Sequence, residues 1–260
     1  MIFTKLPQSI APQSKTVDRS SPELVLLPTL LDAESGAEQV SAALQARMLR
    51  LHHLVVESER EARRMIRRIL PKVDINQYKL YLLNEHSNAS EFVHLLAPME
   101  QGYDLGLMSD AGCPALADPG SALVMEVHRR GWKVVPFSGP SSIMLAWMSS
   151  GLNGQHMEFH GYLPVKSPAL ESKIRDLEAQ SYRTHQTQIW IETPYRNQSL
   201  LHTLLRLLHP STLMCIACRL NGGAEEWIKT CSVQEWKRML GSNLIPDLHK
   251  KPCVFLLQCP

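Results

Sequence analysis

Four loops of this 260-residue sequence combine glycine, proline and polar side chains in patterns that could bind a ligand. The first loop covers residues 109–114 and runs on to residues 118–120. Gly112 lets the backbone approach a ligand closely, and the carboxylate of Asp110 could bind a ribose hydroxyl or an ammonium group. Asp118 followed by Pro119 is typical of a helix start, with Asp118 as the cap. The residues alone leave 110–112 open between a rigid turn and a ligand site.

The other three loops follow in chain order. Residues 139–142 place the hydroxyls of Ser141 and Ser142 at the start of a predicted helix, where free backbone N–H groups favour a polar ligand. Residues 159–164 combine aromatic side chains with a glycine and a proline in a loop or strand edge, and residues 192–196 form a polar cluster after a predicted strand. Their plain structural alternatives are a helix cap, a packed connection between domains and a solvent-facing turn.

The elements that must position these loops alternate between short apolar runs and helical stretches. Predicted strands cover residues 24–27, 53–56, 79–83, 105–108 and 132–137, with helices over 37–50, 59–70, 90–99 and 119–130 between them. This alternation predicts an α/β fold with a mostly parallel sheet covered on both faces. In such sheets ligands bind beyond the carboxyl ends of the strands, so the loops after strands are the candidate sites.

The second half of the chain repeats this style. Predicted helices cover residues 141–150, 167–180, 197–208 and 233–240, and predicted strands cover 188–191, 212–217, 226–231 and 254–258. Turn residues at 138–140 separate the halves, so we expect domains at 22–137 and 138–260. Residues 1–21 are rich in Ser, Pro, Gln and Lys and predict a flexible tail.

Composition restricts the class of protein. Hydrophobic residues make up 44% of the chain and the net charge is only +2, which favours an ordinary globular protein and gives no argument by itself for nucleic acid. No apolar run reaches the ~18 residues that span a membrane, and no signal peptide is evident. The spacing of the six cysteines favours a reducing, cytoplasmic location. Cys215 and Cys218 lie in an apolar run and would point to opposite faces of a strand, so we expect no metal there.

Taken in order, the four loops resemble the tetrapyrrole methylase superfamily, in the branch that 2′-O-methylates a cytidine of bacterial small-subunit ribosomal RNA. That branch typically has Ser-Asp-Ala-Gly-Thr-Pro…Asp-Pro-Gly, Pro-Gly-Pro-Ser, aromatic-x-Gly-aromatic-Leu-Pro and Glu-Ser-Pro-His-Arg segments. Residues 109–120, 139–141, 159–164 and 192–196 match them, and the resemblance spans about residues 24–258.

The resemblance implies a class III S-adenosylmethionine-dependent methyltransferase. Its fold would be two α/β domains, with a mostly parallel N-terminal sheet, a mixed C-terminal sheet and the ligand cleft between them. It implies S-adenosylmethionine as cofactor, no metal, and a homodimer. The implied cofactor-binding residues are Pro28, Asp110, Ala111, Gly112, Cys113, Pro114, Ser141, Ser142, Tyr162, Leu163, Glu192, Thr193 and Pro194.

The sequence also departs from the pattern of that branch. Cys113 stands where threonine is usual, and Thr193 and Tyr195 replace serine and histidine. Residues 219–223 match the usual Arg-Glu-Leu-Thr-Lys segment only at the arginine, and residues 29–32 and 251–252 also differ. The donor site stays plausible, while the methyl acceptor is left open.

Methylation of a ribose hydroxyl requires removal of its proton by a base or by water. Glu57, His86 and Glu192 are the candidate bases near the predicted cleft, and His86 has the most suitable unperturbed pKa. We expect Glu57 and His86 to be the catalytic residues. In the resemblance, residues 57–60 and 85–87 partly match the Glu-Asp-Thr-Arg and Glu-His-Asn segments of the branch.

An RNA acceptor would need a positive surface, and one predicted helix offers it. Arg60, Arg64, Arg67 and Arg68 share one side of that helix, opposite Ala62, Met65, Ile66 and Ile69. Such a stripe would bind phosphates in a salt-dependent, largely sequence-independent way. The alternative is a solvated helix face, because neighbouring glutamates neutralise part of it.

The sequence therefore favours an S-adenosylmethionine-dependent methyltransferase acting on a ribose of small-subunit ribosomal RNA. One alternative is a methyltransferase for a small tetrapyrrole-like molecule. Another is a non-catalytic RNA- or partner-binding protein that retains the fold.

Overall fold

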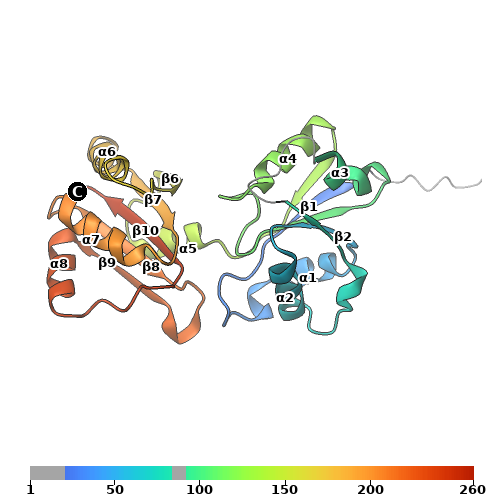
Figure 1. Ribbon diagram of the computed structural model, residues 1–260, viewed down its shortest axis with the longest axis horizontal. Helices are drawn as coiled ribbons and strands as arrows, with labels where there is room; N and C mark the ends of the chain where they lie inside the picture. The colour runs from blue at the N-terminus through green and yellow to red at the C-terminus, as the bar shows by residue number, and fades with distance from the viewer. Residues whose placement is uncertain (1–20, 84–91) are drawn as a thin grey trace, which may run out of the picture.

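The computed structural model describes residues 21–83 and 92–260. The chain forms two lobes, each built on its own sheet (Figure 1). The strands of the N-terminal domain are β1 (Glu23–Leu27), β2 (His53–Val56), β3 (Lys79–Leu82), β4 (Leu105–Met108) and β5 (Lys133–Pro136). They are all parallel, in the order β3-β2-β4-β1-β5. Residues 1–20 of the predicted tail at 1–21, and the catalytic candidate His86, lie outside the described residues.

Helices cover both faces of this sheet (Figure 1). They are α1 (Ala42–Met48), α2 (Glu59–Ile69), α3 (Phe92–Glu100) and α4 (Gly120–Arg129), with short 3-10 helices at Ala37–Gln39 (η1) and Ile75–Gln77 (η2). Helices α1 and α2 pack on one face and α3 and α4 on the other. The single helix expected over residues 37–50 is therefore wrong. Ser41 interrupts it, because its hydroxyl accepts the Leu44 N–H and starts a new helix there.

The C-terminal domain has a mixed sheet. Its strands are β6 (Met157–Tyr162), β7 (Thr187–Glu192), β8 (Leu213–Cys218), β9 (Trp227–Ser232) and β10 (Cys253–Gln258). The order is β6-β7-β10-β8-β9, and only the β6–β7 pair is parallel. Residues 159–164, expected as a loop or strand edge, begin within the edge strand β6. Both sheets confirm the α/β class.

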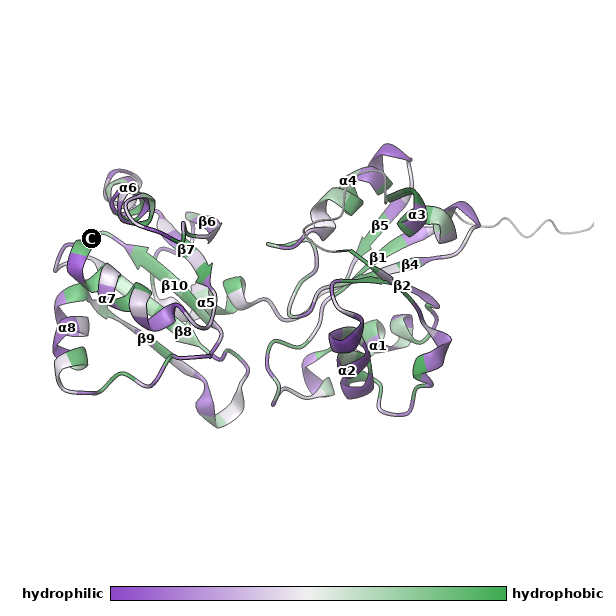
Figure 2. Ribbon diagram, viewed as in Figure 1, coloured by the Kyte–Doolittle hydropathy of each residue, from purple (hydrophilic) through white to green (hydrophobic). Residues whose placement is uncertain are grey.

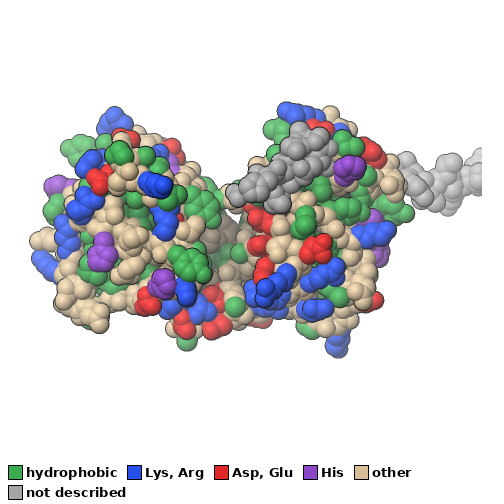
Figure 3. Space-filling view, in the orientation of Figure 1, with side chains coloured by type: hydrophobic (Ala, Val, Ile, Leu, Met, Phe, Trp, Pro, Cys, Tyr) green, Lys and Arg blue, Asp and Glu red, His purple; other side chains and the backbone are tan. Residues whose placement is uncertain are grey.

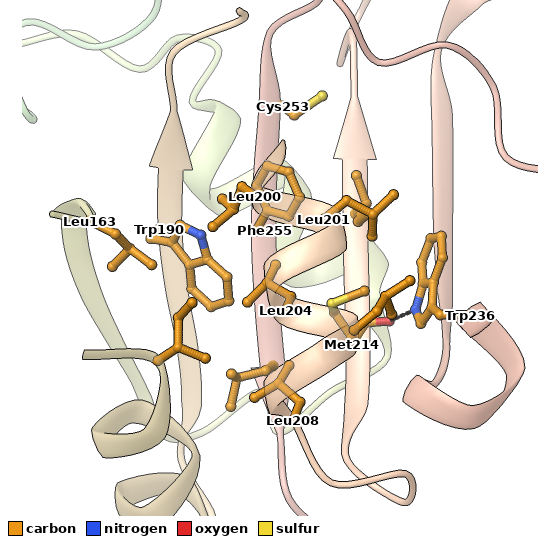
Figure 4. Close-up of a cluster of buried hydrophobic side chains, with 14 of the residues drawn as sticks. Leu163, Trp190, Leu200, Leu201, Leu204, Leu208, Met214, Trp236, Cys253 and Phe255 are labelled. Atoms are coloured by element: carbon orange, nitrogen blue, oxygen red, sulfur yellow. Dashed lines mark hydrogen bonds between the residues drawn. The ribbon is translucent and has the colours of Figure 1, made fainter. Parts of the chain in front are cut away.

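Three helices cover one face of the second sheet and one helix covers the other. They are α6 (Ala169–Thr184), α7 (Asn197–Leu207) and α8 (Val233–Gly241) on the first face and α5 (Ser142–Ser150) on the second, with η3 at Gly223–Glu225. Under α6–α8, the buried rings of Trp190 and Phe255 stack with centroids 6.0 Å apart (Figure 4). Trp236 donates its indole N–H to the Met214 carbonyl at 2.8 Å, so this large ring is buried without losing its hydrogen bond (Figure 4).

The two cysteines of the CxxC segment lie on opposite faces of β8, as the strand period requires. Cys215 packs in the cluster under α5, and Cys218 packs in the cluster under α6–α8. Both are buried free thiols, which confirms that they are small core residues. Across residues 21–83 and 92–260, no helix combines the length and the apolar character needed to cross a membrane.

The topology brings several loops to one place. In a parallel sheet all carboxyl ends lie at the same edge, so the segments after β1, β2, β4 and β5 meet there. The chain leaves the first sheet after Pro136 and enters α5 at Ser142. Ser141 caps that helix and Gly151 ends it with a left-handed φ of 70°, a conformation that favours glycine.

Candidate functional site

A cavity of about 310 Å³ lies between the two domains, in the hollow that separates the lobes (Figure 3). Its size is at the lower end of the range for small-molecule sites. Of the residues that the sequence suggested, the cavity is lined by Glu57, Ala111, Gly112, Cys113, Ser141, Ser142, Tyr162, Glu192 and Pro194. All four loops singled out from the sequence thus contribute to one site.

Close backbone contacts fix the three N-terminal loops against one another. The Thr29 N–H donates to the Gly112 carbonyl at 2.8 Å, which ties the loop after β1 to the loop after β4. A Cβ on Gly139 would lie 2.2 Å from Cβ of Pro28, so only glycine permits this approach. Gly112 itself has a φ of +77°. Pro28 and Pro114 are buried and do not line the cavity, so they support it from behind.

The Asp118 carboxylate both stabilises the turn before α4 and lines the cavity. Helix α4 begins at Gly120, one residue later than Pro119, and the Asp118 carboxylate accepts the N–H groups of Gly120 at 2.7 Å and Ala115 at 2.8 Å. Pro119, not Asp118, is therefore the N-cap residue of α4, and the Asp118 side chain stabilises the turn that precedes the helix. The same residue lines the cavity, and burial raises its pKa.

Asp110 does not line the cavity. It is exposed, and partial burial of its carboxyl group raises its pKa. Its own N–H donates to Glu57 Oε1 at 3.0 Å. The sequence suggested a ligand contact for Asp110, whereas in the structure its backbone binds Glu57 and its side chain lies outside the lining.

Glu57 follows β2 and is half-buried at the cavity wall. Burial raises its pKa, and the negative charges of Asp118 and Asp110 add to the effect against the opposing hydrogen bond from the Asp110 N–H. A carboxylate with a raised pKa is a stronger proton acceptor than an ordinary glutamate.

Glu192 ends β7 on the opposite wall, and its side chain is fully buried. Its Oε1 accepts the Thr193 N–H at 2.6 Å and the Thr193 hydroxyl at 3.2 Å. Its Oε2 lies 3.2 Å from the Arg196 guanidinium, which also donates to the Pro164 carbonyl. Thr193 is not part of the lining; it holds Glu192 in place.

Tyr162 and Leu163 point to different surroundings. Tyr162 lines the cavity, and partial burial, followed by the charges of Glu192 and Glu57, raises its pKa. Leu163 is 3% exposed and packs beside Trp190 in the core (Figure 4). The structure therefore corrects Leu163 from a cofactor contact to a core residue. Successive side chains of extended backbone point to opposite faces, which separates Tyr162 from Leu163.

Part of the lining carried no signal in the sequence. These residues are Leu31, Leu116, Ala117, Ile143, Ile191, Ala217, Leu220, Pro252, Cys253 and Val254. They are mostly apolar, and an apolar residue that faces a cavity has the same sequence pattern as one that faces the core. For Ile191 and Val254, the position at the cavity end of paired strands would have been the only indication.

Helix α2 presents its arginines as the sequence predicted, with one exception. Ala62, Met65, Ile66 and Ile69 are buried, and Arg60, Arg64 and Arg67 are exposed. Figure 2 shows α2 as a strongly hydrophilic helix. Arg64 pairs with Glu61 at 2.9 Å.

Arg68 is the exception. Its guanidinium donates to the backbone carbonyls of Asp32, Ala33 and Ser35, at 3.0 Å for Asp32 and 2.7 Å for Ala33. Only Nη2 of Arg68 makes these bonds; Arg68 thus differs from the exposed Arg60, Arg64 and Arg67, and its role in RNA binding stays a prediction.

The segment that departs most from the expected pattern bridges the domains. Arg219 donates to both carboxylate oxygens of Asp32, at 3.0 and 2.8 Å, and the Ser35 hydroxyl donates to the Asn221 carbonyl at 3.0 Å. Asp32 is 8% exposed. Arg219 also lies 2.5 Å from Glu225. A buried, bidentate pair of this kind fixes geometry as well as charge.

Known proteins resemble this chain in sequence. It is 30% identical to ribosomal RNA small subunit methyltransferase I of Vibrio cholerae over 75% of its length, and 28% identical to the Escherichia coli O157:H7 protein of that name over 79%. It is 29% identical to the Pasteurella multocida protein of that name over 63%. The chain spans 64%, 68% and 53% of these relatives. No family model matches the chain.

Solved structures share the fold. Cobalt precorrin-4 methyltransferase, a cobalamin biosynthetic enzyme, superposes with a TM-score of 0.58 at 12% identity, covering 96% of this chain and 98% of its own. The methyltransferase CobJ superposes with a TM-score of 0.56 at 13% identity, covering 93% of this chain and all of its own. In sequence the chain is thus similar to ribosomal RNA small subunit methyltransferases I, and it shares its fold with methyltransferases such as cobalt precorrin-4 methyltransferase.

Proposed function

We propose that this protein binds S-adenosylmethionine in the cavity between its domains and transfers the methyl group to a ribose 2′-hydroxyl of small-subunit ribosomal RNA. One observation carries the proposal: the four loops singled out from the sequence converge on a single cavity that carries carboxylates on both walls. The sequence relatives named above support the reaction class and the RNA acceptor.

The charge of the lining fits this donor. Glu57, Asp118 and Glu192 bring three carboxylates, and no lysine, arginine or histidine is found among the described residues that line the cavity. S-Adenosylmethionine is a net cation, because its sulfonium and ammonium groups outweigh its single carboxylate. Opposite charges attract strongly in a partly dehydrated cavity, so this lining favours the donor over neutral ligands of similar size.

Two loops suit its other polar groups. The N-terminus of α5 presents free backbone N–H groups and the hydroxyls of Ser141 and Ser142, which suit a carboxylate or a ribose hydroxyl. At Gly112 no side chain separates the backbone from the cavity. When bound, S-adenosylmethionine would supply an electrophilic methyl group on its sulfonium.

Glu57 is the residue of this chain that we assign to the proton of the acceptor hydroxyl. It lines the cavity, it accepts only one hydrogen bond within the described residues, from Asp110, and burial raises its pKa. Tyr162 lines the same cavity and offers a hydroxyl that could orient the acceptor. His86 remains a candidate base on the sequence alone.

The exposed arginines of α2 support an RNA acceptor. Helix α2 begins two residues after Glu57, so Arg60, Arg64 and Arg67 extend from the cavity wall as a row of cations. Binding of phosphates along this row would weaken as salt is raised.

We also propose that the protein works in the cytoplasm, where ribosomal subunits are found, and as a homodimer. Exposed Met144 and Met148, one turn apart on α5, support the dimer, and sedimentation analysis tests it.

Two experiments, performed one after the other, test the proposed function. Calorimetric titration with S-adenosylmethionine should show saturable binding, and no binding at millimolar donor would overturn the enzymatic proposal. Labelled donor should then methylate small ribosomal subunits from a strain that lacks the protein. If the subunits stay unlabelled while a small-molecule fraction is labelled, the acceptor is a small molecule and the RNA proposal fails.

A further inference from the structure

An exposed aromatic and cationic cluster lies beside the cavity and takes no part in the site described so far. Tyr195 is 70% exposed, although it is a large aromatic residue. The His249 ring meets it edge-on with centroids 5.8 Å apart, and the Lys250 ammonium lies 5.8 Å from the centre of its ring. His249 and Lys250 are also exposed. We call these three residues the Tyr195 platform.

The platform is held rigidly from below. The buried amide of Asn197 donates to the carbonyls of Leu248 at 3.1 Å and Lys251 at 2.7 Å, on either side of the two exposed residues. The Lys250 N–H donates to the Pro194 carbonyl at 3.0 Å, which joins the two loops that carry the platform. A ring fixed in this way loses little conformational entropy when a ligand stacks on it.

Within the turn at residues 192–196, Tyr195 exposes its side chain to solvent. In residues 192–196, Glu192 and Thr193 bond to each other, and Arg196 is bound by Glu192 and the Pro164 carbonyl. The polar groups of the neighbouring residues are therefore engaged in local contacts, whereas the Tyr195 ring is exposed to solvent. Beside the platform, the Asp247 carboxylate accepts the His249 N–H at 2.9 Å.

The platform adjoins the cavity through both of its loops. Pro194, directly before Tyr195, lines the cavity, and so does Pro252, two residues after Lys250. Across the cavity, Glu57 leads into the arginines of α2. A nucleic acid strand that reaches the cavity therefore meets arginines on one side and an aromatic ring with a lysine on the other.

We propose that the Tyr195 platform binds a nucleotide of a single-stranded RNA acceptor next to the methylated position. The base would stack on the Tyr195 ring, and Lys250 would neutralise the adjoining phosphate. Unpaired bases stack on exposed aromatic side chains regardless of sequence, and a nearby cation adds electrostatic attraction. The inference rests on the proposed RNA substrate and names the part of the chain that recognises it.

The test compares two exposed tyrosines. Tyr182 is 71% exposed and lies beside Arg175 and Arg183, so it is also an aromatic residue among cations. It lies near Cys259, at the far end of β10 from Cys253 and the cavity. The probe is a fluorescein-labelled single-stranded oligoribonucleotide of about ten nucleotides, a length typical of single-strand binding sites. Its binding to the full chain is followed by anisotropy.

Tyr195→Ala should weaken binding of this probe roughly tenfold, whereas Tyr195→Phe, which keeps the ring, and Tyr182→Ala should change it less than about twofold. Lys250→Ala should weaken binding and reduce its dependence on salt. The affinity for S-adenosylmethionine, measured by calorimetry, should be the same in all variants.

Equal effects of Tyr195→Ala and Tyr182→Ala would overturn the proposal. A loss of donor affinity in Tyr195→Ala would also overturn it, because Tyr195 would then support the donor loop. An effect on ribosomal subunits without one on the oligoribonucleotide would assign the residue to a protein contact instead. If the unaltered chain bound no donor, the proposed function would fail, while the oligoribonucleotide comparison would still decide the role of Tyr195.

Discussion

Glu57 and Glu192 occupy equivalent positions in the two domains, yet their surroundings differ. Each follows or ends a strand and each lines the cavity. Glu192 is fully buried; its Oε1 accepts from Thr193, and its Oε2 has an ion-pair contact with Arg196 but no hydrogen bond within the described residues. Glu57 is half-buried and accepts one N–H among the described residues. The comparison teaches that a carboxylate paired with a neighbouring cation fixes a wall, while a half-buried carboxylate without such a cation is suited to accept a proton.

The largest expected effect comes from the free carboxylate. Glu57→Gln should lower kcat for methyl transfer by about 100-fold or more, because the amide cannot accept the proton. The unfolding free energy near pH 8 should stay equal or rise, because the raised pKa means that the charged form costs folding stability. Single-turnover kinetics and urea denaturation measure the two. If Glu57→Gln lowered the unfolding free energy and left kcat unchanged, Glu57 would have the structural role and Glu192 would be the candidate proton acceptor.

The same group sets a pH dependence. Glu57 must be ionised to act, so kcat/KM should fall as the pH decreases through its pKa, which lies above the ordinary value of about 4.3. Glu57→Gln should remove that acidic limb. An acidic limb that survives the substitution would assign it to another group, such as Asp118, whose pKa is also raised by burial.

Substitution of Glu192, which pairs with Arg196, should mainly reduce stability. Glu192→Ala leaves Arg196 without its acid and should cost about 2–3 kcal/mol of unfolding free energy, less than for a fully buried pair because Arg196 is 23% exposed. Urea denaturation measures it. Glu171, which pairs with Arg206 and Arg175 at the surface, is the matched control, and Glu171→Ala should change stability far less.

A smaller effect should come from the pair that joins the domains. Asp32→Asn should cost about 1–2 kcal/mol at pH 7, because the amide keeps a hydrogen bond to Arg219 and loses the charge. The hydrogen bond from Arg219 holds the pKa of Asp32 below its usual range. The stability difference should therefore be present above pH 4 and disappear as the pH falls through the lowered pKa. A difference that persists at pH 2 would mean that packing, not charge, is responsible.

The smallest effect is expected at Cys113, the residue that departs from the family loop. Its thiol donates to the Pro140 carbonyl at 3.4 Å. A threonine hydroxyl can make the same bond, so Cys113→Thr should change donor affinity by less than about threefold. Calorimetry with S-adenosylmethionine measures this, and a larger change would give the sulfur a specific role on its wall of the cavity.

Much of the fold was predictable because it follows from periodicity. Ala62, Met65, Ile66 and Ile69 recur at helical spacing and all four are buried. The meeting of the loops after β1, β4 and β5 was also predictable, because the carboxyl ends of parallel strands lie at one edge of the sheet.

The misses have a common cause in contacts between distant residues. The Asp110 N–H binds Glu57, and Arg68 binds carbonyls of the loop after β1. Neither partner is visible from residue type or spacing. Leu163 was assigned from the resemblance alone, whereas it lies in the core, on the side opposite to its neighbour Tyr162.

The contacts of Arg68 with three backbone carbonyls connect α2 to the contact between the two domains. The helix that offers arginines to an acceptor also holds, through Arg68, the loop whose Asp32 binds Arg219 in the other domain. A ligand that shifts α2 would therefore change the free energy of the contact between the domains, and thermodynamic linkage makes this coupling reciprocal. On this chain, the affinity for donor should respond to the presence of acceptor by the same factor as the affinity for acceptor responds to donor.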